Sequence, residues 1–544
     1  MDGMEIHGAQ LVLLVLLLFV AAFAALARKL HTPYPIVLVV AGLLLGFVPG
    51  IPKVTLDPDL IFLVVLPPLL YAAAWVTSWR DFSHNLVSIA MLAFGLVGFT
   101  VLGVALAGPL LFRGFDWRIG FVLGAAVATT DAIAATSIAK RIGLPKRIVD
   151  LLEGESLLND ATGLLALEFA VAMVVHGQTP TVISGFLRLA YLTVAGIGSG
   201  LVLAWIAEWF EHRIDDGPIE IAISLLIPYA AYLIAEEIHA SGVLAVVTAG
   251  LYLGSKSSQI FSPSVRLQAR AVWESITFIL NGFVFVLIGL QLPSVLAGVS
   301  ELSTSRLILY GILFSLFLIL LRLFWTFPGA YFSYFVRTRL LHQSEKRPGV
   351  RQIFVVGWTG MRGVIALAAA VSLPQTVADG SPFPHRDLIV FLTFCVILVT
   401  LVVQGLTLPP LIRLLGLAEP SSSKCEEQQA RRLVLEGAQA RLEEIRRSDP
   451  SHFADVYDDL EQHYKHRLAG VGGLARDPQA EHYFRYLDLS RALVGVERDT
   501  ALRLRDEGRI SDEILRELEH ELDLNEARLA AVAEPRPQGS ATPT

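Results

Sequence analysis

The sequence has few charged residues and almost no cysteine. Charged residues make up 17% of the 544 residues, whereas a soluble domain carries about 25%. The two cysteines, Cys395 inside an apolar run and Cys425 beyond the last such run, provide neither a disulfide framework nor a set of metal ligands. The net charge of −7 is small for a chain of this length, so nucleic acid is not an expected partner.

The motifs of common enzymes are also missing from the sequence. It contains no His-Glu-x-x-His pair of metal ligands, no Gly-x-Ser-x-Gly nucleophile turn and, in its C-terminal part, no glycine-rich phosphate loop. An enzymatic function is therefore not expected, and neither is a cofactor.

Long apolar runs are what the chain has in excess. Hydrophobic residues make up 54% of the chain, and the mean hydropathy is +0.59. A helix needs about 20 apolar residues to cross a bilayer, and such runs recur from Leu11 to Leu417. We expect an all-α polytopic membrane protein with about thirteen transmembrane helices, at residues 8–28, 34–50, 58–76, 85–111, 118–140, 148–175, 185–211, 218–238, 241–255, 270–294, 305–335, 351–378 and 387–416.

The charge rises abruptly after the last apolar run, which indicates a second domain. We expect a transmembrane domain at 1–417, a linker at 418–427, a cytoplasmic helical domain at 428–534 and a disordered end at 535–544. Helical spacing in the tail predicts four helices, near residues 424–447, 451–468, 478–507 and 511–532. The tail is expected to be an assembly module, and a regulatory role that senses pH or a ligand is the alternative.

The distribution of basic residues between the spans indicates the orientation of the chain. Arg28 and Lys29 follow the first span, and later connections on the same side hold basic residues such as those at 140–141 and 146–147. By the positive-inside rule these connections are cytoplasmic. We therefore expect a multi-pass protein of the cell (inner) membrane, with the N-terminus outside and the tail in the cytoplasm.

Two of the expected spans are interrupted near their middle. The fifth carries Thr129, Thr130 and Asp131, and the twelfth carries a glycine-rich segment with a cation at residues 357–363. Interrupted helices at corresponding places in two halves are typical of secondary transporters, in which freed carbonyls and half-helix ends hold ions. We expect spans one to six and eight to thirteen to form inverted repeats.

The sixth span places four side chains that carry oxygen atoms at neighbouring helical positions. Ser156 and Asp160 share one face, and Glu155 and Asn159 lie one position round. Carboxylates at membrane depth are costly and usually mark ion pathways. Hard monovalent cations prefer oxygen ligands and a carboxylate also accepts a proton, so one carboxylate can exchange the two ions. The alternative is that Asp131 and Asp160 only pair with arginines inside the membrane.

These residues resemble those of the monovalent cation/proton antiporters, in the bacterial sodium/proton exchanger branch of the first cation:proton antiporter family. The most specific segment is Gly-Glu-Ser-Leu-Leu-Asn-Asp at 154–160, which is similar to the family's Asn-Asp motif in the sixth helix. Supporting segments are Leu-Pro-Pro-Leu-Leu-Tyr at 66–71, residues 281–291 with Pro293, and Gly-Met-Arg-Gly at 360–363. The resemblance spans residues 8–417 and extends to the tail.

The resemblance implies a role for each residue of this cluster. Asp160 would carry the cation or the proton, with Asp131 and Ser156 as further ligands. Na+ or K+ would thus be held at these three side chains, and the Thr130 carbonyl would contribute at the unwound crossing. Asn159 would stabilise the site, and the Asn-Asp pair implies electroneutral exchange of one cation for one proton.

The resemblance also implies three supporting charged residues and a quaternary structure. Glu155 would pair with Arg322 in the eleventh span, and Arg362 would neutralise the half-helix ends in the twelfth. The implied assembly is a homodimer, in which a mobile core carries the ion past a static dimerisation domain.

One departure from the family pattern bears on ion selectivity. Many relatives place an acidic residue just after the run at 66–71, where this chain has Ala72, Ala73 and Ala74. A residue that could serve as an extra ligand or gate is therefore missing. The expected partners are Na+, with Li+ or K+ as other cations, together with the proton and membrane lipid. The alternatives are a K+/H+ antiporter and a cation channel with a regulatory tail.

Overall fold

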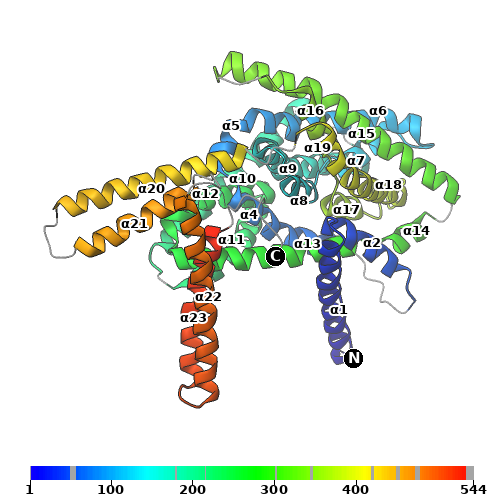
Figure 1. Ribbon diagram of the computed structural model, residues 1–544. Coiled ribbons are helices and arrows are strands. Elements are labelled where there is room, and N and C mark those ends of the chain that lie inside the picture. The colour runs from blue at the N-terminus through cyan, green and yellow to red at the C-terminus, as the bar shows by residue number, and fades with distance from the viewer. Residues whose placement is uncertain are drawn as a thin grey trace. The chain divides into compact units, whose positions relative to one another are not determined.

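The computed structural model describes residues 2–49, 57–177, 181–214, 216–299, 303–343, 347–417, 422–448, 454–471 and 478–533. Within these ranges the chain is helical, and its one extended pairing is an isolated bridge between Thr376 and Pro382 (Figure 1). The chain forms two compact units, Met1–Glu419 and Pro420–Thr544. The expected all-α class is confirmed for the part of the chain that the structure describes.

The first unit contains every expected transmembrane range, and each of the thirteen ranges falls on helix. Within the described residues, eight helices are long and apolar enough to cross a membrane, and α2 and α7 are shorter apolar helices. The elements, in which η marks a π-helical turn, are α1 (Asp2–Lys29), α2 (Tyr34–Gly46), α3 (Pro58–Leu60), η1 (Ile61–Val65), α4 (Leu66–Val76), α5 (Trp79–Ala90), η2 (Met91–Leu96), α6 (Val97–Leu111), α7 (Trp117–Ala126), α8 (Ala132–Ile142), α9 (Lys146–His176), α10 (Val182–Glu211), α11 (Gly217–Glu237), α12 (Gly242–Ile260), α13 (Pro263–Leu290), α14 (Leu292–Gly298), α15 (Thr304–Phe335), η3 (Val336–Leu340), α16 (Val350–Trp358), α17 (Val364–Val371), α18 (Arg386–Val399), η4 (Thr400–Gln404) and α19 (Gly405–Leu414).

Some expected boundaries are wrong, and helix caps explain two of them. The fourth span was expected from residue 85, but α5 begins at Trp79 because the Ser78 hydroxyl accepts a hydrogen bond from the Asp81 N–H at 3.3 Å. The tenth was expected from residue 270, but Ser262 caps α13 in the same way, through the Val265 N–H at 3.4 Å. Polar first turns of this kind resemble loops in a hydropathy profile.

Both expected interruptions are present in the structure. Helix α7 ends at Ala126 and α8 begins at Ala132, so the segment between them includes the three residues expected to break the fifth span. Helix α16 ends at Trp358 and α17 begins at Val364, which leaves the glycine-rich residues 359–363 non-helical. Helix α17 then ends at Val371, well before the expected end of the twelfth span at 378.

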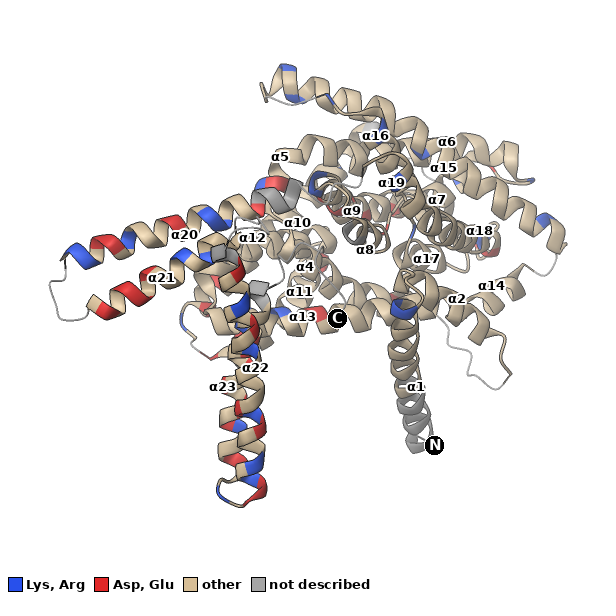
Figure 2. Ribbon diagram, in the orientation of Figure 1, with Lys and Arg blue, Asp and Glu red and all other residues tan. Residues whose placement is uncertain are grey.

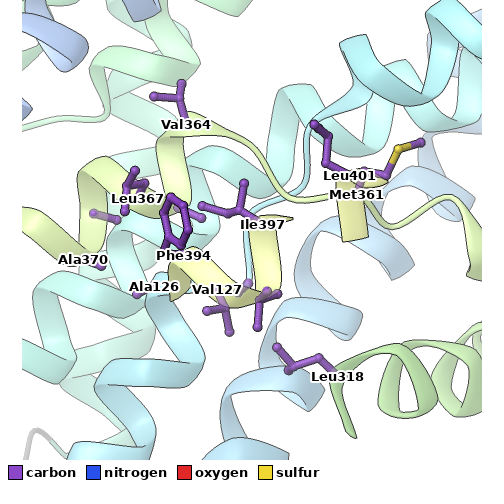
Figure 3. Packing of buried hydrophobic residues seen from close by; sticks show 14 of the residues in the cluster. Ala126, Val127, Leu318, Met361, Val364, Leu367, Ala370, Phe394, Ile397 and Leu401 are labelled. Carbon is purple, nitrogen blue, oxygen red and sulfur yellow. The ribbon is translucent and has the colours of Figure 1, made fainter. Parts of the chain in front are cut away.

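Buried apolar side chains form two clusters in the first unit. The larger includes the interrupted helices: Phe394 and Ile397 of α18 lie near Leu367 of α17, and Met361 of the break lies beside Leu401 of η4 (Figure 3). The smaller cluster joins α4, α10, α11 and α12. The interruptions are thus enclosed by close-packed side chains, which shield their backbone from lipid.

The tail forms four helices, α20 (Ser422–Ser448), α21 (Ala454–Val471), α22 (Pro478–Asp506) and α23 (Asp512–Ala533). Charged residues of both signs recur along these helices, whereas most of the ribbon of the first unit is uncharged (Figure 2). A small core of Tyr483, Leu487, Val494 and Leu529 joins α22 to α23. Helix α20 already includes residues 422–427 of the expected linker 418–427, and the remainder of that linker and the expected disordered end lie outside the described residues.

Candidate functional site

The two interruptions are joined directly through the main chain. The Asp131 N–H, after the first break, donates a hydrogen bond to the Met361 carbonyl of the second at 2.8 Å. The Arg362 N–H donates to the Thr400 hydroxyl of η4 at 3.1 Å. These bonds satisfy backbone groups that the breaks would otherwise leave unpaired in an apolar interior. The result is a fixed crossing of four half-helices, α7, α8, α16 and α17.

Asp131 lies where two of these half-helices begin. Its Oδ1 accepts a hydrogen bond from the Ile133 N–H at 2.8 Å, which caps α8. Gly363 immediately precedes α17, and a Cβ at that position would lie 2.8 Å from Oδ2 of Asp131. A helix N-terminus stabilises negative charge, so the crossing favours a carboxylate here. Only glycine allows the start of α17 to approach that carboxylate so closely.

Helix α9 contacts the first break through the side chains predicted to converge there. The Ser156 hydroxyl donates to the Thr130 carbonyl at 2.8 Å, and the Asn159 amide donates to the Thr130 hydroxyl at 2.5 Å. Thr130 therefore receives a hydrogen bond at both of its oxygens. Ser156 and Asn159 thus fix the unwound segment against α9. Ser156 lies one helical turn before Asp160, and Asn159 immediately precedes Asp160.

Asp160 is the carboxylate of this site with the least compensation. Its side chain is 2% exposed, and its Oδ1 has no hydrogen-bond partner among the described residues. In the part of the chain that the structure describes, neither aspartate forms an ion pair with an arginine, so the alternative of simple structural pairing is not supported. An uncompensated buried carboxylate is suited to bind a proton or a cation.

Glu155, one position before Ser156, has the opposite surroundings. It forms the expected ion pair with Arg322 of α15, with both carboxylate oxygens engaged at 2.5 Å and 2.9 Å and both side chains almost fully buried. Arg322 also donates to the carbonyls of Val356 and Gly357, each at 3.2 Å. These carbonyls end α16, so Arg322 neutralises the negative end of that half-helix.

The guanidinium of Arg362 is buried close to the second break. It is 2% exposed, and its Nε and Nη1 have no hydrogen-bond partner among the described residues. The hydrogen bonds to the carbonyls that end α16 come from Arg322. A role for Arg362 in neutralising half-helix ends stays a prediction.

Some polar groups near the crossing were not anticipated from the sequence. Thr400, which holds the second break, and Gln404, with a buried Oε1 that has no partner among the described residues, both belong to η4. The hydroxyl of Thr129, which belongs to the expected first break, also has no hydrogen-bond partner among the described residues, and neither does the carboxylate of Glu211 in α10. The signal for Thr400 and Gln404 was a polar pair inside the thirteenth apolar run, at the spacing of one helical turn.

The donor set of the crossing consists of oxygen atoms. Within the described residues, no group of three or more His, Cys, Asp and Glu side chains could hold a metal ion. Two carboxylates, a serine hydroxyl and a threonine carbonyl are ligands suited to a hard monovalent cation. The same carboxylates can also accept protons.

Comparison with known proteins gives a consistent picture. The family model described as the transmembrane sodium/hydrogen exchanger matches residues 14–414. An uncharacterized Na+/H+ exchanger of Mycobacterium tuberculosis is 34% identical over 549 residues, which covers 97% of this chain and 99% of that protein. A sodium, potassium, lithium and rubidium/H+ antiporter of Bacillus pumilus is 34% identical over 420 residues, covering 75% of this chain and 61% of that protein.

The fold also has a solved counterpart. The structure of the sodium proton antiporter MjNhaP1 from Methanocaldococcus jannaschii at pH 8 aligns with a TM-score of 0.57, covering 77% of this chain and 100% of that chain. The sequence identity is 20%, so this similarity concerns the fold alone. It covers less of this chain than the M. tuberculosis relative does.

Proposed function

The chain belongs to the sodium/hydrogen exchanger family, and from this premise we propose that it exchanges Na+ for H+ at the crossing of its two interrupted helices, with one cation for each proton. It is a multi-pass membrane transporter of the monovalent cation/H+ antiporter type, not an enzyme. The proposal concerns the ion, the stoichiometry and the residues that carry the exchange.

The mechanism depends on one carboxylate that holds either ion but not both. Asp160 binds the cation together with Asp131 and Ser156, while the Thr130 carbonyl completes the oxygen set. Protonation of Asp160 removes its charge and with it the main attraction for the cation. Alternating access then moves the loaded or the protonated site from one side of the membrane to the other.

The observation that carries this proposal is the contrast between two buried acids five residues apart. Glu155 is fully neutralised by Arg322, so it has no charge to offer to an ion. Asp160 is equally buried, yet its Oδ1 has no partner among the described residues. A buried negative charge is costly when it is not compensated, and a bound cation or proton supplies that compensation.

Proton flux in sealed proteoliposomes tests the proposed exchange. Vesicles with an acidic interior and purified protein are given Na+, Li+ or K+, and internal alkalinisation is followed with a pH-sensitive dye. We expect Na+-dependent alkalinisation that Asp160→Asn abolishes. A matched control is Glu168→Gln, an exposed acid two turns further along α9. Exchange that persists in Asp160→Asn would show that another group carries the ions.

K+/H+ exchange is the second candidate because the B. pumilus relative is named for potassium as well as sodium. The absence of an acidic residue at Ala72 removes one group that could discriminate between the ions.

A cation channel is the third candidate function. Flux that saturates with cation concentration and responds to an opposing proton gradient supports exchange, whereas ohmic single-channel current contradicts it.

The architecture that we propose follows from the same helices. We propose thirteen crossings, an odd number that puts the two ends of the chain on opposite sides, and the basic connections then favour an N-terminus outside and a tail in the cytoplasm. Spans one to six and eight to thirteen form inverted repeats, each with one interrupted helix, and two copies of the chain form a dimer. The tail is either an assembly module or a regulator of transport. If deletion of residues 421–544 leaves the dimer intact but alters the pH profile of exchange, the tail regulates transport and does not hold the dimer together.

A further inference from the structure

A cavity lies in the first unit, and neither of the crossing carboxylates, Asp131 and Asp160, is among its lining residues. Its volume is about 750 Å³, and it lies where α9 and α16 begin, where α5 continues into η2 and where α15 continues into η3. Its lining residues include four arginines, Arg147, Arg337, Arg347 and Arg351. No acidic side chain is among the described residues that line it. The cavity is therefore a site of concentrated positive charge at one end of the helices.

The arginines are arranged around a less polar interior. Arg147, Arg347 and Arg351 are exposed, whereas Arg337 is only 3% exposed and donates to Gln343 at 2.8 Å and Asn85 at 3.5 Å. The lining surface is mostly apolar and includes buried Leu92, Ile148, Ile353 and Val356, and the polar side chains of Asn85, Thr326 and Ser333 are also buried there. The cavity thus combines exposed cations with a hydrocarbon-lined interior.

The inner end of the cavity reaches the support of the ion crossing. Thr326 and Val356 line it, and both are hydrogen-bonded to Arg322: the Thr326 hydroxyl donates to the Arg322 carbonyl at 2.9 Å, and the Arg322 guanidinium donates to the Val356 carbonyl. A molecule in this cavity contacts the residues that hold the end of α16. The cavity has a direct route to the site without sharing its carboxylates.

We propose that this cavity binds an anionic phospholipid, with its phosphate on the exposed arginines and the start of an acyl chain on the apolar lining. Guanidinium groups bind phosphate through charge-assisted, often bidentate hydrogen bonds. Basic pockets between transmembrane helices are suited to lipid headgroups. The arginines of this cavity lie at helix ends, which is the depth at which headgroups are found. The apolar lining favours a lipid over a soluble phosphate compound, which has no hydrocarbon to place there.

The test uses the purified full-length chain in detergent, with the melting temperature followed as lipid is added. Phosphatidylglycerol is the anionic probe, and phosphatidylcholine is the neutral lipid for comparison. The variant is Arg347→Gln with Arg351→Gln. Its matched control is Arg80→Gln with Arg339→Gln, which removes the same charge from exposed arginines that do not line the cavity.

We expect phosphatidylglycerol to raise the melting temperature of the unaltered protein and of the control more than phosphatidylcholine does. In the cavity variant, half of this rise should require about tenfold more lipid, because charge-assisted bonds to phosphate are lost. If the double variant melts differently without lipid, Arg347→Gln alone serves as the variant.

Three results would overturn the proposal. Equal responses of the cavity variant and the control would place the lipid elsewhere. Equal stabilisation by phosphatidylcholine would mean that charge does not select the ligand. A full effect from glycerol phosphate, which has the headgroup chemistry without acyl chains, would assign the cavity to a soluble phosphate compound. These readouts do not depend on transport, so they stand apart from the proposed exchange.

Discussion

Replacing Glu155 by glutamine should destabilise the protein strongly, because Arg322 would stay buried without an opposite charge. Both side chains are at most 2% exposed, and the guanidinium uses two nitrogens on the carboxylate. Removing one partner of a buried ion pair costs about 3–5 kcal/mol. Glutamine keeps one acceptor oxygen for the guanidinium, which places the expected loss near the lower end, at about 3 kcal/mol.

The loss should appear in the free energy of unfolding. The assay is reversible unfolding in mixed micelles as dodecyl sulfate is titrated in, followed by tryptophan fluorescence. The matched control is Glu274→Gln, which breaks the Arg270–Glu274 pair at 2.8 Å, where both side chains are mostly exposed. A solvent-exposed pair within one helix contributes little, so this variant should unfold almost as the unaltered protein does.

The comparison between the two variants decides the outcome. If Glu155→Gln unfolded at the same denaturant concentration as Glu274→Gln, then Glu155 and Arg322 would not form a buried pair. If Glu155→Gln were destabilised but kept its cation selectivity, the pair would act as structural support, as the geometry indicates. A changed selectivity with unchanged stability would instead make Glu155 an ion ligand and contradict the reasoning.

Three further predictions test other parts of the account. Asp160→Asn should abolish exchange and Asp131→Asn should impair it severely, while both elute as folded protein in size-exclusion chromatography; a normal exchange rate in Asp160→Asn would refute the assigned carrier. Gly360→Ala should destabilise the protein, because its Cβ would overlap the fixed Arg322 side chain, whereas Gly98→Ala, with open space around it, should be neutral in the same unfolding assay. Burial, then neighbouring arginines, lower the pKa of His463 in the tail below its usual 6.5. The neutral form is thus favoured by folding, so the tail should lose stability as the pH falls below about 6.5. Hydrogen exchange of tail peptides, corrected for its intrinsic pH dependence, should show this loss, and His463→Gln should reduce it.

Much of the transmembrane unit could be predicted from the sequence because its signals are local. Apolar runs mark the spans directly. The first break is marked by Asp131 next to two threonines, and the second by the glycines at 360 and 363. Helical spacing also predicted that Ser156 and Asn159 would lie on neighbouring faces, and both contact Thr130 in the structure. The helix beginnings at Trp79 and Pro263 were missed because their polar first turns carry no hydropathy signal.

Contacts between distant segments were the hardest to predict. The resemblance to a known family indicated the pairing of Glu155 with Arg322, but spacing alone does not reach across 167 positions. Arg322 also donates to the carbonyls that end α16. This contact depends on how α15 packs against α16, which the sequence does not specify locally. The hydrogen bond from Asp131 to the Met361 carbonyl likewise requires both breaks to be at the same depth. Such facts come from tertiary packing, which no local pattern specifies.

The central claim is that a single carboxylate, Asp160, binds either a cation or a proton. The most direct test is isothermal titration of Na+ into the purified protein, repeated in buffers of different ionisation enthalpy, which gives the number of protons released for each cation bound. We predict that Na+ binding releases protons at acidic pH, tightens as the pH rises, and disappears in Asp160→Asn. Sodium binding that releases no proton at any pH would contradict exchange through a shared carboxylate.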